Sequence, residues 1–166
     1  MSKIILKSIH NPKVLNIIGA GLAGTEAAWQ ASNLGIEVNL FEMRPKKSTA
    51  AHQTSNLAEL VCSNSFRSNS IKNAVGLLKE EMRNLNSLII NCAEESAVPA
   101  GTALAVDREI FSRKVTEKIE NNSKINLIKE EVKNLDPFKS RTTIIASGPL
   151  TSDSLSEEIR KLTNQK

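Results

Sequence analysis

Apolar positions in the first quarter of the chain change from a continuous run to helical spacing and back. Residues 14–24 begin as a mostly apolar run and end in a segment with three glycines. Residues 22–34 then show helical spacing and stop near Gly35, a residue type that commonly ends helices. A second strand-like segment covers residues 36–42, with its apolar run at residues 38–41. The pattern predicts a strand, a helix and a second strand.

The middle of the chain departs from this simple alternation. Residues 43–56 are polar and contain a proline, so they predict a loop. One amphipathic helix is predicted over residues 73–90, and residues 99–101 predict a turn. A further helix is predicted over residues 107–122, beginning at an acid that the helix dipole favours. The apolar positions with helical spacing in the first of these helices are Leu78, Met82, Leu85 and Ile89.

The last part of the chain returns to strand and helix. Residues 125–128 predict a third parallel strand, the pair 136–137 breaks the chain, and residues 142–146 predict a buried strand. Ser152 or Asp153 then caps a final helix. The alternation predicts an α/β fold, a Rossmann-like doubly wound parallel sheet with a helical excursion. We expect a short N-terminal lead-in over residues 1–13 and a single domain over residues 14–166.

The first strand and helix are joined by Gly-x-Gly-x-x-Gly, the dinucleotide-binding motif. Gly19 permits the tight turn, Gly21 allows a diphosphate to approach the backbone, and Gly24 allows close helix–strand packing. Glu42, at the end of the next strand, is placed to bind a ribose hydroxyl, which favours FAD or NAD over NADP. The alternative is a tight turn in another α/β protein, with Glu42 as a solvated charge. The candidate cofactor-binding residues of the turn are Gly19, Ala20, Gly21, Leu22, Ala23 and Gly24.

Composition narrows the class of protein. The chain has 166 residues, of which 40% are apolar and 24% charged, and no apolar run approaches the roughly 20 residues of a membrane span. This predicts a soluble globular protein without a membrane partner, and residues 1–13 do not resemble a signal peptide. Two cysteines favour a reducing compartment, so we expect a cytoplasmic protein. Neither these cysteines nor the two histidines have zinc-site spacing, and no metal site is predicted.

The charge balance leaves a nucleic-acid partner open. The net charge is +4 and the pI is about 9.1, which is compatible with such a partner but does not require one. Aromatic residues make up 3% of the chain, and the single tryptophan, Trp29, lies inside the first predicted helix. A base-stacking surface is therefore not expected, and Trp29 is interpreted as a core residue.

Several long stretches resemble one protein family. The chain is similar to the N-terminal part of the TrmFO family, the FAD- and folate-dependent tRNA (uracil-5-)-methyltransferases. The resemblance runs from about Val14 to the end of the chain but covers well under half of the family's usual length. The stretches that carry it are AHQT at 51–54, AELVCSNS at 58–65, NAVGLLKEEMR at 73–83, VPAG at 98–101, ALAVDR at 103–108 and SGPLTSD at 147–153.

The resemblance implies a specific reaction. In this family methylenetetrahydrofolate donates a one-carbon unit to reduced FAD, the flavin passes it to C5 of a T-loop uridine in tRNA, and NAD(P)H supplies electrons. The resemblance implies that the glycine turn and Glu42 hold the FAD diphosphate and ribose. It also implies that Gly148 lies in a turn that passes the cofactor, and that tRNA is the macromolecular partner.

Cys62 is the candidate catalytic residue, because the resemblance matches it to one of two cysteines that the family uses near the flavin. A thiolate that adds to C6 of a pyrimidine activates C5. Thiolate character needs a positive neighbour, and Arg67 or the basic stretch of Arg44, Lys46 and Lys47 is the candidate source. Cys62 can instead be a small buried residue. Ser63, Asn64 and Ser65 either bond a flavin edge or cap a turn, and Cys92 is interpreted as core.

The chain also departs from the family. The second functional cysteine, the C-terminal part of the FAD domain and the tRNA-contacting domain have no counterpart here, so we expect a partial FAD-binding domain. Thr102 replaces a glycine, which matters if that position has positive φ. Four hypotheses follow: a methyltransferase completed by another chain, a non-catalytic FAD- or NAD-binding module, a degenerate remnant, and a relative of the GidA tRNA-modifying flavoproteins.

Overall fold

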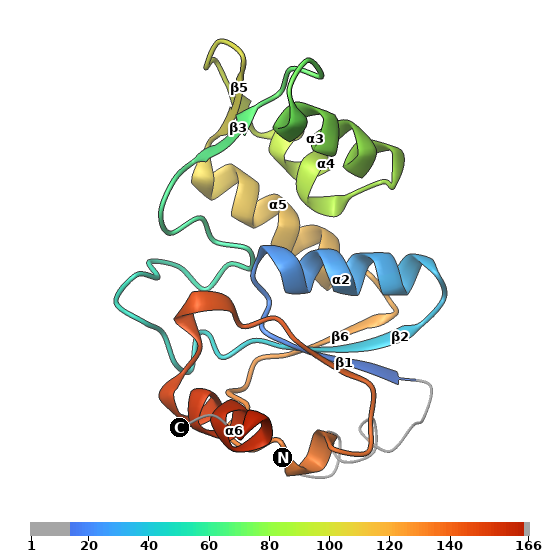
Figure 1. The fold of residues 1–166 in the computed structure, drawn as a ribbon, viewed down its shortest axis with the longest axis vertical. Coiled ribbons are helices and arrows are strands. Elements are labelled where there is room, and N and C mark those ends of the chain that lie inside the picture. Colours follow the sequence, from blue (N-terminus) through green and yellow to red (C-terminus); the bar gives the residue numbers. More distant parts are fainter. Residues whose placement is uncertain (1–13, 165–166) are drawn as a thin grey trace.

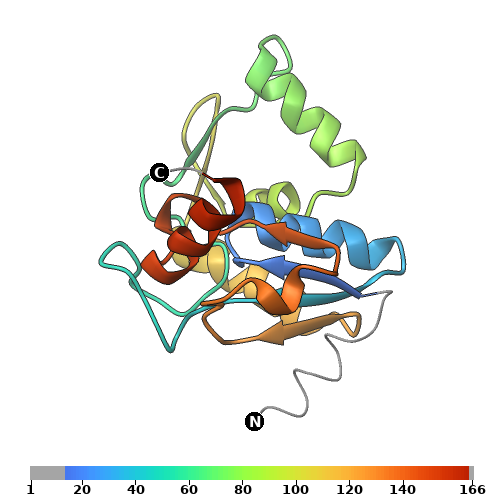
Figure 2. The ribbon, with the colours of Figure 1, turned by 60° about the horizontal axis from the view of Figure 1, so that its bottom comes forward.

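Four parallel strands form the central sheet of the computed structural model, which describes residues 14–164. The strands are β1 (Val14–Ile18), β2 (Glu37–Phe41), β6 (Ile125–Ile128) and β7 (Thr143–Ile145), in the order β6-β2-β1-β7. Figure 2 shows this order across the sheet. The register aligns the whole length of β1 with the whole length of β2. The predicted α/β fold with a parallel sheet is confirmed, whereas the expected lead-in, residues 1–13, lies outside the described residues.

Each face of the sheet carries its own hydrophobic core. On one face, Ile17 and Leu40 pack in a large cluster that includes residues of α2 (Leu22–Asn33) and α5 (Arg108–Glu120). On the other face, Ile18 and Phe41 pack with Phe138 and with Leu155 of α6 (Asp153–Thr163). Figure 1 shows α2 and α5 on one side of the sheet and α6 on the other. The alternation of side chains along each strand therefore buries both faces, as expected for a parallel sheet with helices on both sides.

The predicted helices over 22–34 and 107–122 are confirmed as α2 and α5. The carboxylate of Asp107 caps α5, because it accepts hydrogen bonds from the backbone N–H groups of Glu109 and Ile110, both at 3.0 Å. This capping accounts for the acid at the helix start. Phe111, Val115 and Ile119 are fully buried on the inner face of α5.

The single helix predicted over residues 73–90 is wrong, because the structure has two helices there. They are α3 (Ala74–Asn84) and α4 (Leu88–Glu95). The chain turns between them at Asn86, which has φ +54°, and the hydroxyl of Ser87 accepts a hydrogen bond from the backbone N–H of Ile90 to cap α4. Leu85, counted in the apolar face of the predicted helix, is 68% exposed. Helical spacing continues across the break and conceals it.

A small antiparallel sheet was not predicted. It consists of β3 (Ser65–Ser68), β4 (Ala97–Val98) and β5 (Ala103–Val106) in the order β3-β5-β4, and it lies beside α3 and α4, away from the central sheet (Figure 1). These strands are too short to show a period of two. Thr102, next to β5, is not among the described residues with positive φ, and that conformation falls instead on Gly101, with φ +62°. The threonine therefore introduces no backbone strain.

The strand predicted over residues 142–146 exists, but it is not buried. β7 forms one edge of the sheet and pairs, within the described residues, only with β1. Ile144 and Ile145 are 39% and 38% exposed. The predicted break at residues 136–137 is a short 3-10 helix, η1 (Asp136–Phe138). The hydroxyl of Ser152 caps α6 by accepting from the backbone N–H of Leu155, as one of the two predicted caps.

Candidate functional site

The turn between β1 and α2 is held by two glycines that have no space for a side chain. Gly19 has φ +101°, and a Cβ atom there would lie 2.7 Å from the Cα atom of Ser147. A Cβ atom on Gly24 would collide with the carbonyl oxygen of Gly19. The first glycine therefore allows the turn to lie against the segment after β7, and the second allows α2 to pack onto the turn. The positive φ of Gly19 agrees with the tight turn expected from the motif, and the contact at Gly24 agrees with the expected close packing of the helix, whereas the contact of Gly19 with Ser147 was not predicted.

Gly21, the middle glycine, differs from the other two because the space beside it is open. No heavy atom lies within 4 Å of the position that its Cβ atom would take. Gly21 is also the N-cap of α2, and no side chain caps this helix end. The N–H groups of a first helical turn have no partner within the helix and favour an anion. The structure thus has an open approach to an uncapped helix N-terminus.

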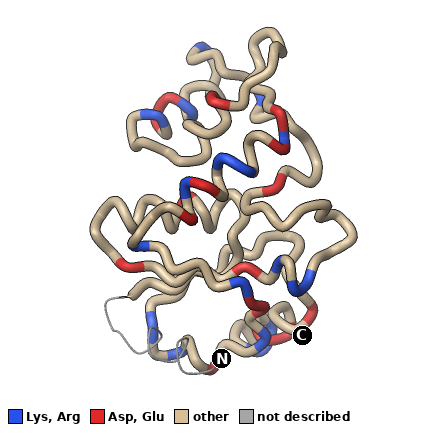
Figure 3. Tube along the Cα trace, turned by 180° about the vertical axis from the view of Figure 1, so that it is seen from behind, with Lys and Arg blue, Asp and Glu red and all other residues tan. Residues whose placement is uncertain are grey.

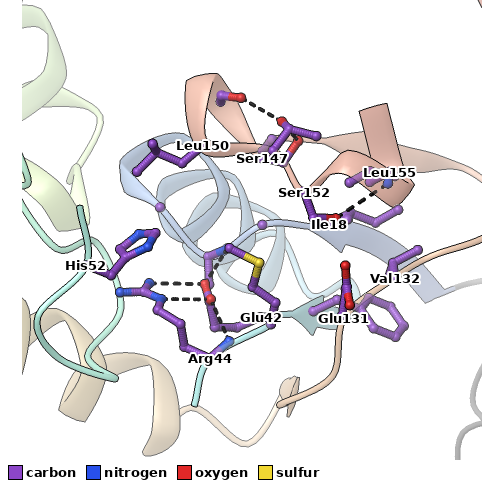
Figure 4. A pocket seen from close by; sticks show the side chains of 18 of the residues that line it. Ile18, Glu42, Arg44, His52, Glu131, Val132, Ser147, Leu150, Ser152 and Leu155 are labelled. Atoms are coloured by element: carbon purple, nitrogen blue, oxygen red, sulfur yellow. Dashed lines mark hydrogen bonds and ion pairs between the residues drawn. The ribbon is translucent and has the colours of Figure 1, made fainter. Parts of the chain in front are cut away.

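This approach is part of a cavity of about 330 Å³. That volume lies at the lower end of the roughly 300–1,000 Å³ that is typical of small-molecule sites. Figure 4 shows the cavity between the end of β2 and the segment around Ser147 and Leu150. Gly24 contributes only through the packing of α2. The candidate residues that line the cavity are Gly19, Ala20, Gly21, Leu22, Ala23, Glu42 and Gly148.

Glu42 presents a buried carboxylate to the cavity. It accepts hydrogen bonds from the backbone N–H groups of Ala20, at 3.3 Å, and Arg44, at 3.0 Å. The Arg44 guanidinium adds contacts of 2.9 Å from Nε and 3.2 Å from Nη2. Burial alone would raise the pKa of Glu42, but the hydrogen bonds and charge of Arg44 outweigh it and lower the pKa below its ordinary value. The carboxylate is therefore ionised.

Gly148 lies on the opposite wall, in the short helix η2 (Gly148–Leu150), with φ +63°. The hydroxyl groups of Ser147 and Thr151 are 2.6 Å apart across this turn, and the Thr151 hydroxyl also donates to the carbonyl of Gly148. These bonds fix the turn where it faces the first glycine of the motif. The wall after β7 and the turn after β1 thus enclose the cavity together.

Cys62 is exposed and does not line the cavity, although its neighbour Val61 does. The interpretation of Cys62 as a small buried residue is therefore wrong. Ser63 serves the local turn, since its hydroxyl accepts from the backbone N–H of Ser65, whereas the Asn64 side chain donates to the carbonyl of Val106 at the end of β5. Cys92 is fully buried in the core, as predicted, and burial raises the pKa of its thiol.

The basic stretch expected beside Cys62, Arg44 with Lys46 and Lys47, is bound elsewhere. Arg44 contacts Glu42 and Glu59, while Lys46 and Lys47 form ion pairs with Glu130 at 3.1 Å and Glu131 at 2.7 Å. The cation that reaches the Cys62 residue is Arg108, whose Nη2 donates to the Cys62 carbonyl over 3.3 Å. Sequence reasoning missed this arginine, because it interpreted the start of this helix only through the acid that precedes Arg108.

Along the chain, positively and negatively charged residues are largely interspersed (Figure 3). Lys114 and Lys118, for example, both bind the carboxylate of Glu95, at 2.9 and 2.6 Å. Among the described residues, no group of three His, Cys, Asp or Glu side chains is arranged to hold a metal ion. Within residues 14–164, none of the helices is long and apolar enough to cross a membrane.

Comparisons with known proteins give consistent results. The family model described as glucose inhibited division protein A matches residues 14–166. A curated methylenetetrahydrofolate--tRNA-(uracil-5-)-methyltransferase TrmFO from Natranaerobius thermophilus is 62% identical over 149 residues, which are 90% of this chain and 34% of that protein. The TrmFO of Bacillus subtilis is 56% identical over 155 residues, which are 93% of this chain and 35% of that protein. The chain thus spans about a third of the length of these relatives.

One solved structure also aligns, a crystal structure of a mutant of MHPCO. It has 12% sequence identity and a TM-score of 0.40, and the alignment covers 70% of this chain and 32% of that one.

Proposed function

The chain belongs to the family described as glucose inhibited division protein A, and from this premise we propose that the cavity at the start of α2 binds FAD. The 56–62% identity to curated TrmFO proteins confirms the resemblance to TrmFO that the sequence motifs indicate. The observation that carries the proposal is the open space at Gly21, beside an uncapped helix N-terminus and a buried, ionised carboxylate. A side chain at Gly21 would fill the approach that a diphosphate requires.

Each part of the cavity has a role in this proposal. The first-turn N–H groups of α2 donate to the diphosphate, and the Glu42 carboxylate accepts from a ribose hydroxyl. The turn at Gly148 forms the opposite wall. The additional phosphate on the ribose of NADP would face the Glu42 carboxylate directly and be repelled by it. The cavity therefore favours FAD or NAD over NADP. Bound FAD would supply the redox and one-carbon chemistry, and the protein supplies its position.

For the whole reaction, we propose the activity printed in the relatives' name, methyl transfer from methylenetetrahydrofolate to a uracil of tRNA. NAD(P)H is the proposed reductant and tRNA the proposed partner. Cys62 is the proposed nucleophile: its thiolate forms a bond to C6 of the uracil, and the electrons of the C5–C6 double bond move toward C5. The exposure of Cys62 supports this role, since the thiol is open to a large substrate.

A second candidate function is cofactor binding without turnover. It is favoured by the separation of the two candidate sites, because Cys62 is exposed and does not line the cavity. Binding and catalysis are therefore separable properties of this chain.

Two measurements test these proposals. Quenching of FAD fluorescence gives the affinity, and competition with NAD and NADP gives the preference. We expect NAD to displace FAD at lower concentration than NADP, and equal displacement would contradict the role of Glu42. Transfer of a labelled one-carbon unit to tRNA that lacks the T-loop methyl group then separates the candidates. Label that appears with the unaltered chain and not with Cys62→Ser supports the enzyme, whereas FAD binding without label supports the binding module.

A further inference from the structure

Arg44 is buried between two carboxylates, and only 3% of its side chain is exposed. Its Nε and Nη2 atoms donate to Glu42, while its Nη1 atom donates to Glu59 over 3.0 Å. Figure 4 shows the guanidinium beside the Glu42 carboxylate at the cavity wall. The planar guanidinium can reach both acids at once because its N–H groups point in fixed, different directions.

Glu59 in turn fixes the loop that precedes Cys62. Its carboxylate accepts hydrogen bonds from the backbone N–H groups of Gln53, at 2.9 Å, and Thr54, at 3.3 Å. The two N–H groups lie five and six positions earlier in the chain, so the carboxylate closes the loop on itself. Without a fixed Glu59, these donors have no other protein partner among the hydrogen bonds of the described residues.

The same loop is also bonded directly to the glycine turn. The backbone N–H of Ala58 donates to the carbonyl of Ala20 over 2.9 Å, and Ala58 is fully buried with φ +51°. The backbone N–H of Ala20 donates to Glu42. A closed circuit therefore runs from Ala20 through Glu42, Arg44 and Glu59 to Ala58, and back to Ala20. Cys62 follows this circuit by three residues.

We propose that Arg44 is a positioning residue, which joins the carboxylate of the cofactor site to the loop that leads into Cys62. This inference rests on the proposed function for the identity of the ligand at Glu42. Arg44 holds Glu42 and Glu59 in one cluster, so the ribose-binding acid and the loop of residues 53–59 move together. The cofactor site and the nucleophile-bearing segment thereby become one unit.

A simpler role for Arg44 is to neutralise two buried acids. A lysine would keep the positive charge but has no planar group that bonds both carboxylates. Arg44→Lys therefore separates bridging from neutralisation, and Arg44→Met removes both. Lys46→Met is the matched control. This substitution also removes an ion pair with a glutamate, but Lys46 is exposed and lies outside the circuit.

Amide hydrogen exchange, which needs no cofactor, tests the circuit first. In the full chain, we expect Arg44→Lys and Arg44→Met to accelerate exchange across residues 53–58 by roughly tenfold or more, the effect of losing a charge-assisted hydrogen bond. Exchange in α5 should stay unchanged in these variants, and Lys46→Met should leave both segments unchanged. Slow exchange retained in Arg44→Lys would overturn the bridging role. Acceleration that extends equally to α5 would do so too, because it would show global destabilisation.

FAD affinity in a double-mutant cycle provides the second test. If Glu59 acts through Arg44, Glu59→Gln weakens FAD binding in the unaltered chain and has no further effect in Arg44→Met. An equal effect of Glu59→Gln in both backgrounds would show that Glu59 contacts the ligand by itself and would contradict the proposal. If the unaltered chain binds no FAD, the proposed function fails, and the exchange measurement alone decides whether Arg44 holds the loop.

Discussion

Alanine substitutions at two glycines of the same turn should separate folding from binding. At Gly24 a Cβ atom would collide with the carbonyl oxygen of Gly19, a backbone atom that cannot rotate away. At Gly21 a Cβ atom would meet nothing within 4 Å, and the backbone already has φ −75°, which alanine adopts easily. Gly24→Ala should therefore destabilise the fold, whereas Gly21→Ala should leave the fold intact and obstruct the cavity.

The magnitudes follow from these contacts. Overpacking against backbone costs up to about 3 kcal/mol of folding free energy. Alanine also restricts the unfolded chain, which offsets about 0.4–1 kcal/mol of this cost, so Gly24→Ala should lower the free energy of unfolding by about 2–3 kcal/mol. For a chain of this length, that lowers the Tm by roughly 4–12 °C. At Gly21 the loss of a glycine N-cap costs about 0.5–1 kcal/mol, and the same gain in the unfolded state offsets it. The Tm of Gly21→Ala should therefore stay close to that of the unaltered chain.

FAD binding should respond strongly to Gly21→Ala, the variant whose Tm stays nearly unchanged. A methyl group at Gly21 displaces the diphosphate from N–H donors, and each charge-assisted hydrogen bond is worth about 1.5–3 kcal/mol, so FAD affinity should fall between about tenfold and 150-fold. Thermal unfolding followed by circular dichroism and FAD titration by fluorescence quenching give the two quantities. The reasoning would be refuted by a Gly21→Ala protein that binds FAD as tightly as the unaltered chain, or by a Gly24→Ala protein that melts at the unaltered Tm.

Two further predictions concern titratable groups. Iodoacetamide should alkylate Cys62 in the native protein and Cys92 only under denaturing conditions, as read by mass spectrometry, because Cys62 is exposed and Cys92 is fully buried; rapid native labelling of Cys92 would contradict the core packing. The pKa of Glu42 is lowered in the folded state, so its contribution to stability is present above pH 4.5, the ordinary value, and is lost as the pH falls through the folded pKa. The Tm should therefore decrease as the pH is lowered from 4.5, and this decrease should be less steep in Glu42→Gln. An identical pH dependence of the two proteins would contradict the ionised state of Glu42.

The unit formed by residues 14–42 could be predicted from sequence because its determinants are local. Apolar runs, helical spacing and the three glycines each constrain the backbone within a few residues. The steric role of Gly24 follows from the approach of α2 to the turn that precedes it. The crowding at Gly19 comes instead from Ala146 and Ser147, which lie far along the chain, so the motif predicted the turn but not this contact.

The elements predicted wrongly depend on contacts that spacing does not encode. The break between α3 and α4 is set by the left-handed conformation of Asn86, while the apolar spacing runs on to Ile89. A short apolar run such as that of β7 is compatible with a central strand and with an edge strand. Its exposure follows from the order of strands in the sheet, which the run itself does not determine.

In the site, sequence reasoning identified the backbone turn but not the ion-pair circuit. Glu42 was predicted as a cavity residue, and it lines the cavity. Arg44 was assigned to the surroundings of Cys62, whereas it binds Glu42 and Glu59. Arg44 and Glu59 are separated by fifteen positions of irregular loop, and no periodic pattern predicts such a contact. Long-range pairs between loops require the folded structure.

The most direct test of the account is an absorbance spectrum of the purified chain, repeated after addition of FAD and removal of the excess. We predict a flavin band that stays with the protein and is released on denaturation, and that is lost in Gly21→Ala. A folded chain that retains no flavin would contradict the central claim, because the open glycine turn and the Glu42 carboxylate would then not be a cofactor site.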